Sequence, residues 1–290
     1  MTERNDPLAP LRAKIDQIDD ALHDLFMERA NIVREIADVK AHQTGTAGPV
    51  FAMRPGREAS ILRRLAERHS GALPRQVIGR IWRELIAAKC RMQGPFQVAI
   101  YGASDIVGYW DVARSHFGSD TPTVMCDTVR LVLQKVANEA GVVGVLPTPG
   151  CGDSGTDWWQ GLAHGSAGDR AGPQIVARLP FFRSERKPER DAVAVAKVDR
   201  EETGEDRTYL VLHGPANVSR TSCLKTIEAA GISAQLVDWQ SDRESVLLLD
   251  AEGYISGDDP RLSAARQAAG GAIMHISVIG GYAVPYHLPG

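Results

Sequence analysis

The sequence contains no long hydrophobic run and little cysteine. No window approaches about 18 consecutive uncharged apolar residues, which excludes a membrane-spanning helix and any membrane partner. The opening residues MTERNDP lack the apolar stretch of a secretory signal peptide, so we expect a cytoplasmic protein. The cysteines are far apart, without C-x-x-C or metal-ligand spacing, which predicts reduced, buried thiols and no metal site: Cys90, Cys126, Cys151 and Cys223.

A large excess of charge is also missing. The net charge of −3 conceals an asymmetry, because residues 1–94 carry 16 Lys and Arg against 12 Asp and Glu, while the remainder has a net charge of −7. The arginines of the first part are spread along expected helices and are not clustered with aromatic residues. We therefore expect no nucleic-acid partner, and a modestly basic first domain that suits a small anionic substrate.

The glycine fingerprint of dinucleotide sites is absent. A strand is expected at residues 96–102, but the glycines that follow, in Gly102–Gly108, do not have the G-x-G-x-x-G spacing. We therefore expect no nicotinamide cofactor. Gly152–Gly155 has the letters of a serine-protease motif, but its helical and α/β context disagrees, and Asp153 and Ser154 are interpreted as helix caps.

The first strong pattern present is Leu11–Lys40, whose apolar residues recur three and four apart and predict an amphipathic helix. Arg29 lies on the apolar stripe, and Lys40 returns to within about 20° of it three turns later, about 16 Å along the axis. Two cations on a face that should be buried can hold an anion between them. Alternatively, they extend to solvent or pair with acids of neighbouring helices.

Two further helices are expected, at residues 57–69 and 74–93, and each places polar groups on its apolar face. Glu58 opens the buried side of the first of them. Lys89 and Gln93 continue the apolar stripe of the second, which begins at Pro74. Three helices therefore present polar residues to one inner surface.

This constellation resembles the all-α class of chorismate mutases over residues 8–94. The resemblance implies an intertwined homodimer in which Arg12 enters the partner's site. The helix geometry agrees, because Arg12 lies about 100° from the stripe and about 25 Å from Arg29. The residues that carry it are Leu11–Asp16, Glu28, Arg29, Lys40, Arg57, Glu58 and Gln93.

The implied activity is the Claisen rearrangement of chorismate to prephenate in phenylalanine and tyrosine biosynthesis, an isomerase reaction that requires no metal or cofactor. By resemblance, Arg12 and Arg29 bind the two carboxylates, Lys40 and Gln93 donate to the ether oxygen, Glu58 accepts from the ring hydroxyl, and Arg57 supports the site. Two positions depart from the family but are still counted among the expected substrate-binding residues. Arg54 stands where some members have aspartate, and its main chain could still contribute; Lys89 stands where a serine is found, and its charge could raise affinity or crowd the site.

Residues 95–182 resemble the first lobe of prephenate dehydratase, on the segments Val98–Gly102, His116–Gly118 and Gly144–Pro149. The functional residues of that family are not kept: Thr148–Gly150 replaces its Glu-Asn-Ser, and its Thr-Arg-Phe has no counterpart near Arg190–Ala192. The chain is also too short here for a second lobe of about 100 residues. We therefore expect a single degenerate lobe without dehydratase activity.

Residues 183–290 show the order βαββαβ and resemble the ACT domain that binds phenylalanine in bifunctional mutase/dehydratase proteins. Its ligand signatures have changed to Val218–Arg220 and Asp238–Ser241. We expect a retained fold that serves dimer contacts, without phenylalanine binding. The whole is thus predicted to be a multidomain enzyme, with two alternatives: a bifunctional protein with residual dehydratase activity, or a non-catalytic regulatory module.

Overall fold

The computed structural model describes residues 6–44, 51–102, 106–150, 157–165, 172–184 and 190–288. Contacts between residues divide the chain into two compact units, residues 1–50 and 51–290. The expected helix caps Asp153 and Ser154, and Cys151, lie outside the described residues.

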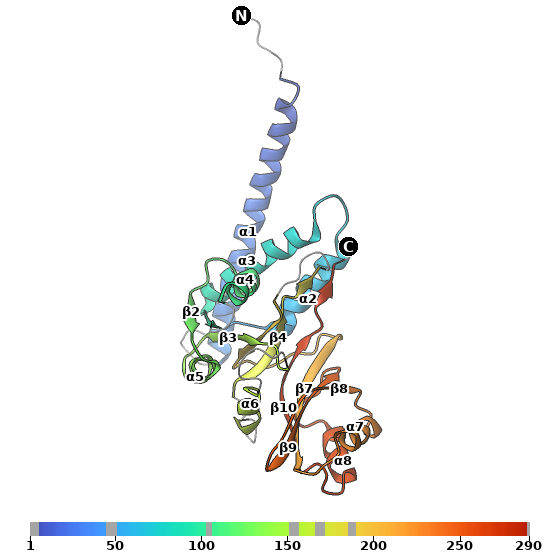
Figure 1. The fold of residues 1–290 in the computed structure, drawn as a ribbon. Helices are drawn as coiled ribbons and strands as arrows, with labels where there is room; N and C mark the ends of the chain where they lie inside the picture. Colours follow the sequence, from blue (N-terminus) through green and yellow to red (C-terminus); the bar gives the residue numbers. More distant parts are fainter. Residues whose placement is uncertain are drawn as a thin grey trace, which may run out of the picture. The chain divides into compact units, whose positions relative to one another are not determined.

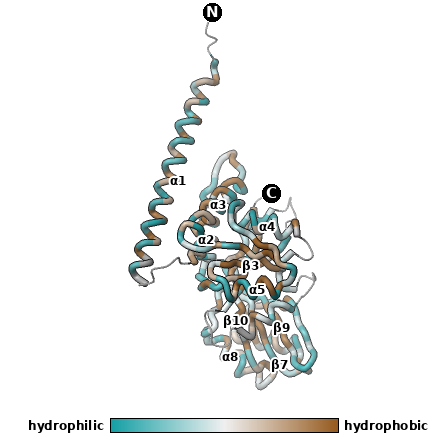
Figure 2. Tube along the Cα trace, turned by 90° about the vertical axis from the view of Figure 1, so that its left-hand side faces the viewer, coloured by the Kyte–Doolittle hydropathy of each residue, from teal (hydrophilic) through white to brown (hydrophobic). Residues whose placement is uncertain are grey.

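The first unit contains one long helix, α1 (Ala9–Thr44), which confirms the helix expected from the apolar periodicity. Figure 2 shows hydrophilic and hydrophobic positions alternating along it from end to end. Its apolar side chains are about half exposed, for example Leu11 at 60%, Ile18 at 51% and Leu25 at 60%.

The second unit begins with the other two expected helices, α2 (Pro55–Arg68) and α3 (Arg75–Gln93). Proline occupies the first turn of α2 and directly precedes α3, where its missing N–H costs no hydrogen bond. The two helices pack against each other. In addition, α2 contacts strand β10 and α3 contacts helix α4, both of the sheet-containing part of this unit.

That part is built on a nine-stranded sheet in the order β2-β1-β3-β6-β4-β10-β7-β9-β8 (Figure 1). Its first half has parallel strands joined by helices, and β6 then runs antiparallel between β3 and β4. The elements are β1 (Gln97–Tyr101), α4 (Ile106–Phe117), β2 (Thr123–Cys126), α5 (Val129–Asn138), β3 (Val142–Pro147), α6 (Gln160–Gly165), β4 (Gln174–Leu179) and β6 (Ala192–Ala196). A separate pair joins β5 (Phe182–Arg183) to β11 (Tyr286–His287).

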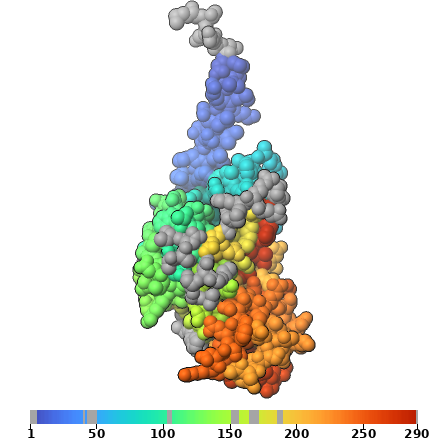
Figure 3. Space-filling model, in the orientation of Figure 1, coloured from blue at the N-terminus to red at the C-terminus, as the bar shows by residue number. Residues whose placement is uncertain are grey.

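The second half of the sheet is antiparallel and has the expected order βαββαβ. In the space-filling view most of its residues, coloured orange, form a lobe below the green residues of the first half (Figure 3). The elements are β7 (Asp206–Pro215), α7 (Arg220–Ala229), β8 (Ala234–Ser241), β9 (Glu244–Glu252), α8 (Pro260–Ala268) and β10 (His275–Ala283).

One glycine joins the two halves of the sheet. β10 pairs with β4 through Gly280 and Ile175 alone, beside a bulge in the pairing of β10 with β7. Gly280 has φ of +133°, and a Cβ there would lie 2.2 Å from the carbonyl oxygen of Ile175. Only a residue without a side chain permits this approach.

Two large cores lie on the sheet. One hydrophobic cluster fills the first half of the sheet and its helices and continues onto one face of β7, β9 and β10, and a second lies between the other face of these strands and helices α7 and α8. A third cluster, of Ala59, Leu62 and Phe181, fixes α2 onto the end of β4. Cys90, Cys126 and Cys223 are buried free thiols, as expected. None of the described helices has the length and apolar character that crossing a membrane requires.

Candidate functional site

The start of α2 is held by a carboxylate from a distant part of the chain. Glu201 accepts a hydrogen bond from Nε of Arg54 at 2.9 Å, forms an ion pair with the same guanidinium, and accepts the backbone N–H of Arg57 at 3.1 Å. It thus satisfies a free N–H group at a helix N-terminus, where negative charge is favourable. The side chain of Arg57 is exposed.

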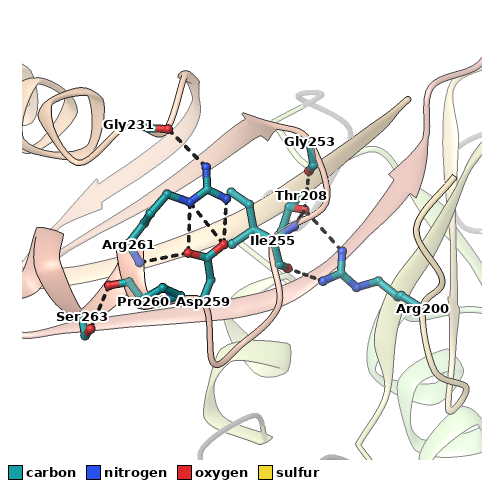
Figure 4. A network of polar contacts seen from close by, with 9 residues as sticks. All are labelled: Arg200, Thr208, Gly231, Gly253, Ile255, Asp259, Pro260, Arg261 and Ser263. Carbon is teal, nitrogen blue, oxygen red and sulfur yellow. Dashed lines mark hydrogen bonds and ion pairs between the residues drawn. The ribbon is translucent and has the colours of Figure 1, made fainter. Parts of the chain in front are cut away.

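The segment that carries Glu201 is itself fixed to the C-terminal half. Arg200 donates to the carbonyl of Ile255 at 2.6 Å and to the hydroxyl of Thr208 at 3.4 Å (Figure 4). Its guanidinium also lies 4.8 Å from the ring centroid of Tyr254. The linker between β6 and β7 therefore connects the βαββαβ part to the first turn of α2.

Glu58 lies one turn into α2 and is buried, with 5% of its surface exposed. Its Oε2 is 3.5 Å from Nη1 of Arg83 on α3, which is 6% exposed, and its Oε1 accepts the backbone N–H of Arg54 at 3.3 Å. Both contacts are at the long end of the hydrogen-bond range, so the carboxylate keeps capacity to accept another hydrogen bond.

Burial dominates the electrostatics of this pair. It raises the pKa of Glu58, while the positive charges of Arg83 and Lys89 lower that pKa. Burial lowers the pKa of Arg83 to about 10, so this guanidinium stays charged at neutral pH. The neighbouring Cys90 thiol has its pKa raised to about 12, mainly by burial, and is therefore not a thiolate.

Lys89 and Gln93 are half-buried and lie one turn apart on α3, as the sequence pattern predicts. Lys89 is close enough to Glu58 for its charge to act on that carboxylate. Of the expected residues of α2 and α3, the structure therefore places Lys89 near Glu58, and the joint role of these residues in one site remains a prediction.

The three expected residues of the first helix lie in the other unit. Arg12 is exposed and forms an ion pair with Asp6. Arg29 is in the middle of α1, and the backbone of Lys40 belongs to the same helix, but its side chain lies outside the described residues. The relation of Arg12, Arg29 and Lys40 to α2 and α3 remains a prediction.

Arg83 and Glu201 were not predicted from the sequence. Arg83 shares a helix face with Gly79, Ile86 and Cys90, all buried, so a charged residue on a second apolar face was a usable signal. Glu201 carried no such signal, since it lies 147 residues from its partner Arg54. Among the described residues, no group of three His, Cys, Asp or Glu side chains can hold a metal ion.

The helical region matches a known family. Residues 11–94 match the family described as chorismate mutase type II. Over these residues the chain is similar to that family. The resemblance inferred from the scattered constellation on three helices is thereby confirmed.

Curated proteins similar to this chain are bifunctional. The chain is 32% identical over 143 residues to a bifunctional chorismate mutase/prephenate dehydratase of Pseudomonas aeruginosa, and 30% identical over 142 residues to that of Stutzerimonas stutzeri. Each match covers 49% of this chain and 39% of the relative, so the matched segment spans about two fifths of these relatives. A matched segment of 143 residues is too long to lie within residues 1–94, so the match extends beyond α3.

Among solved structures, a prephenate dehydratase from Streptococcus mutans superposes with a TM-score of 0.47 at 18% identity. The superposition covers 67% of this chain and all of that chain.

C-terminal to residue 94, charged side chains near the expected signature positions make contacts within the chain. Arg178 of β4 donates to Asp191 at 2.8 Å, and Arg183 of β5 forms an ion pair with the same carboxylate. In the βαββαβ part, the guanidinium of Arg220 lies 4.0 Å from the ring centroid of Trp239.

Proposed function

We propose that this protein is a chorismate mutase that converts chorismate to prephenate. The observation that carries the proposal is the match of residues 11–94 to the chorismate mutase type II family. The inward-facing polar residues of α2 and α3 support it, because Glu58 and Lys89 lie in one region of the second unit.

The reaction is an intramolecular rearrangement, so the protein must hold the dianion in its reactive conformation and stabilise the negative charge that develops on the ether oxygen. Arg29, with Arg12 of a second chain, binds the two carboxylates as bidentate forks. Lys40 and Gln93 donate to the ether oxygen.

Glu58 accepts a hydrogen bond from the ring hydroxyl of the substrate. Its contacts with the Arg83 guanidinium at 3.5 Å and the Arg54 N–H at 3.3 Å are long, which leaves it able to accept a shorter one. Arg57 supports the site from the same turn of α2.

The two departures from the family pattern receive separate roles. Arg54 is engaged by Glu201, so we assign it to fixing the start of α2 and not to the substrate. Lys89 acts on Glu58 and adds a positive charge that favours a dianionic substrate.

We further propose that the mutase acts as a homodimer in the cytoplasm. The half-exposed apolar stripe of α1, which includes Leu11, Ile18 and Leu25, is a surface that a second chain would cover. Such a dimer would bring Arg12 into the site of the partner subunit.

A steady-state assay of chorismate consumption tests the proposal. We expect turnover by the wild type and a loss of about 10²–10³-fold in kcat/KM for Lys40→Ala and for Arg29→Ala, because each removes a charge-stabilising donor. Turnover that both substitutions leave unchanged would contradict the assigned site. Absence of turnover by the folded wild type would favour a non-catalytic binding module.

For the middle region we propose that dehydratase activity has been lost. Thr148 directly follows β3 where the family has Glu-Asn-Ser, and Arg178 and Arg183 are both engaged by Asp191. The bifunctional relatives favour residual dehydratase activity as the second candidate. Formation of phenylpyruvate from prephenate at neutral pH, above the uncatalysed rate, would establish that candidate.

For the C-terminal region we propose an ACT-like domain that serves chain contacts and does not bind phenylalanine. Residues of both changed signature segments contact other residues of the same chain. Arg220 stacks on Trp239, and Asp238 accepts a hydrogen bond from the indole N–H of Trp159 at 3.1 Å. Titration calorimetry with phenylalanine and with tyrosine tests this, and tight binding of either would contradict it.

A further inference from the structure

Arg83 lies where the mutase helices meet the sheet-containing part. Its guanidinium lies 5.7 Å from the ring centroid of Phe181, which lies just beyond the end of β4, and 3.5 Å from Glu58 on α2. One turn earlier on α3, a Cβ on Gly79 would lie 2.4 Å from the ring of Phe182, so the helix and this segment are in close contact. Arg83 is therefore held by two elements besides its own helix.

Charged and titratable groups face Glu58 from every element packed around it. A small cavity lined by Glu58, Arg83 and Phe181 is also lined by His116 of α4, whose pKa is held well below its usual value by burial and by Arg83, so the imidazole is neutral. The other groups are Lys89 and Cys90 of α3, Arg178 of β4, Glu201 of the linker and the backbone N–H of Arg54.

Arg83 is the best placed of the cations to fix the Glu58 carboxylate. Among the described interactions, Arg83 is the cation that lies within 3.5 Å of a Glu58 carboxylate oxygen. The side chains of Arg83 and Glu58 are almost completely buried. A planar guanidinium against an aromatic ring has little freedom to move. Lys89, by contrast, is half-buried and acts on Glu58 through its charge.

We propose that Arg83 is a positioning residue of the mutase reaction: it orients the Glu58 carboxylate toward the substrate hydroxyl and keeps it charged. This inference rests on the proposed mutase function. Because Phe181 and His116 belong to the part C-terminal to the mutase domain, that part contributes to the site even without any activity of its own.

The pH dependence of kcat/KM for chorismate, measured with the full-length chain, tests this. Burial raises the pKa of Glu58 and the positive charge of Arg83 lowers it, so Arg83→Met should raise this pKa further. We expect the acidic limb of the profile to move to higher pH by about 1–3 units. Arg83→Lys, which keeps the charge, should restore most of the wild-type profile. A role in packing alone would instead lower kcat/KM equally at every pH, and that result would overturn the proposal.

Two controls isolate the pair. Arg80→Met removes an exposed arginine from the same helix and should leave the profile unchanged. In the Glu58→Gln background, which removes the buried carboxylate and so tolerates loss of the cation, Arg83→Met should no longer move the acidic limb. A shift that persists in that background would overturn the proposal.

A measurement without substrate separates this inference from the proposed function. In the full chain labelled with ¹³C at the glutamate carboxyl groups, the Glu58 signal is the one lost in Glu58→Gln. Its titration should move to higher pH in Arg83→Met and stay near wild type in Arg83→Lys. An unchanged titration in Arg83→Met would overturn the role of Arg83 whether or not the protein turns over chorismate.

Discussion

The α2–α3 pair and helix α1 leave their apolar residues in opposite situations. Leu62 of α2 is fully buried against Ala59 and Phe181, whereas Leu25 of α1 is 60% exposed. Each helix carries apolar residues at helical spacing, and those of α2 and α3 are covered where these helices pack against each other and against the sheet-containing part. The pair is stabilised within one chain, and α1 presents a surface that remains to be covered.

The largest stability effect should come from the buried charge pair of the packed helices. Arg83→Met leaves Glu58 buried without its closest cation, and we expect the free energy of unfolding to fall by about 3–5 kcal/mol. Arg80→Met, at an exposed position of α3, should change it by less than about 0.5 kcal/mol. Urea unfolding followed by circular dichroism compares them. If Arg83→Met and Arg80→Met lowered the free energy of unfolding equally, the Arg83–Glu58 pair would not contribute to stability.

Truncation of a leucine in each region is the most direct test of the comparison. Leu62→Ala removes a fully buried side chain and should cost about 2–5 kcal/mol of unfolding free energy at any protein concentration. Leu25→Ala should leave the unfolding of the second unit unchanged and instead weaken self-association, measured by sedimentation over a range of concentrations. Loss of urea stability of the second unit in Leu25→Ala would contradict the separation of the two regions.

Acid should act on the packed region and not on α1. Burial and the Arg83 charge hold the pKa of His116 well below 6.5, so the folded state keeps this imidazole neutral while the unfolded chain takes up a proton. Stability is then complete above pH 6.5 and falls as the pH is lowered, by about 1.4 kcal/mol per pH unit until the folded pKa is reached. His116→Phe should flatten this limb of the stability curve.

His23 is the matched control for that measurement. It lies on α1 and its side chain is 71% exposed, so His23→Gln should leave the dependence of stability on pH as in wild type. If the stability of His116→Phe still fell at low pH as in wild type, a group other than His116 would be responsible for the proton uptake on unfolding.

The helices and strands were predictable because each is a local pattern. The three N-terminal helices, the first strand and the βαββαβ order follow from periodicity and turn residues, and the structure has all of them. The place of β6 (Ala192–Ala196) between β3 and β4 was not predicted, because strand order depends on contacts far apart in sequence. The three domain boundaries remain predictions.

The candidate site was predictable only where its residues lie on periodic helix faces. Glu58, Lys89 and Gln93 could be named as candidates because they interrupt or extend an apolar stripe. The residues that hold them were not found, since Glu201 and Phe181 come from segments far along the chain whose proximity is created by folding. Candidate ligand contacts could thus be named from a local pattern, whereas the residues that contact Arg54 and Arg83 could not.

Arg12 should have the smallest effect on stability and still matter for activity. Its ion pair with Asp6 is exposed, so Arg12→Ala should change the unfolding free energy by less than about 1 kcal/mol.

If α1 carries Arg12 into the site of a partner subunit, Arg12→Ala and Arg29→Ala should each be inactive alone and recover activity when mixed. A mixed dimer has one intact site of its two, and random exchange makes half of the dimers mixed, so about a quarter of wild-type activity is expected. Recovery of none, with exchange of chains verified by mass spectrometry, would place Arg12 and Arg29 in a site of one and the same chain.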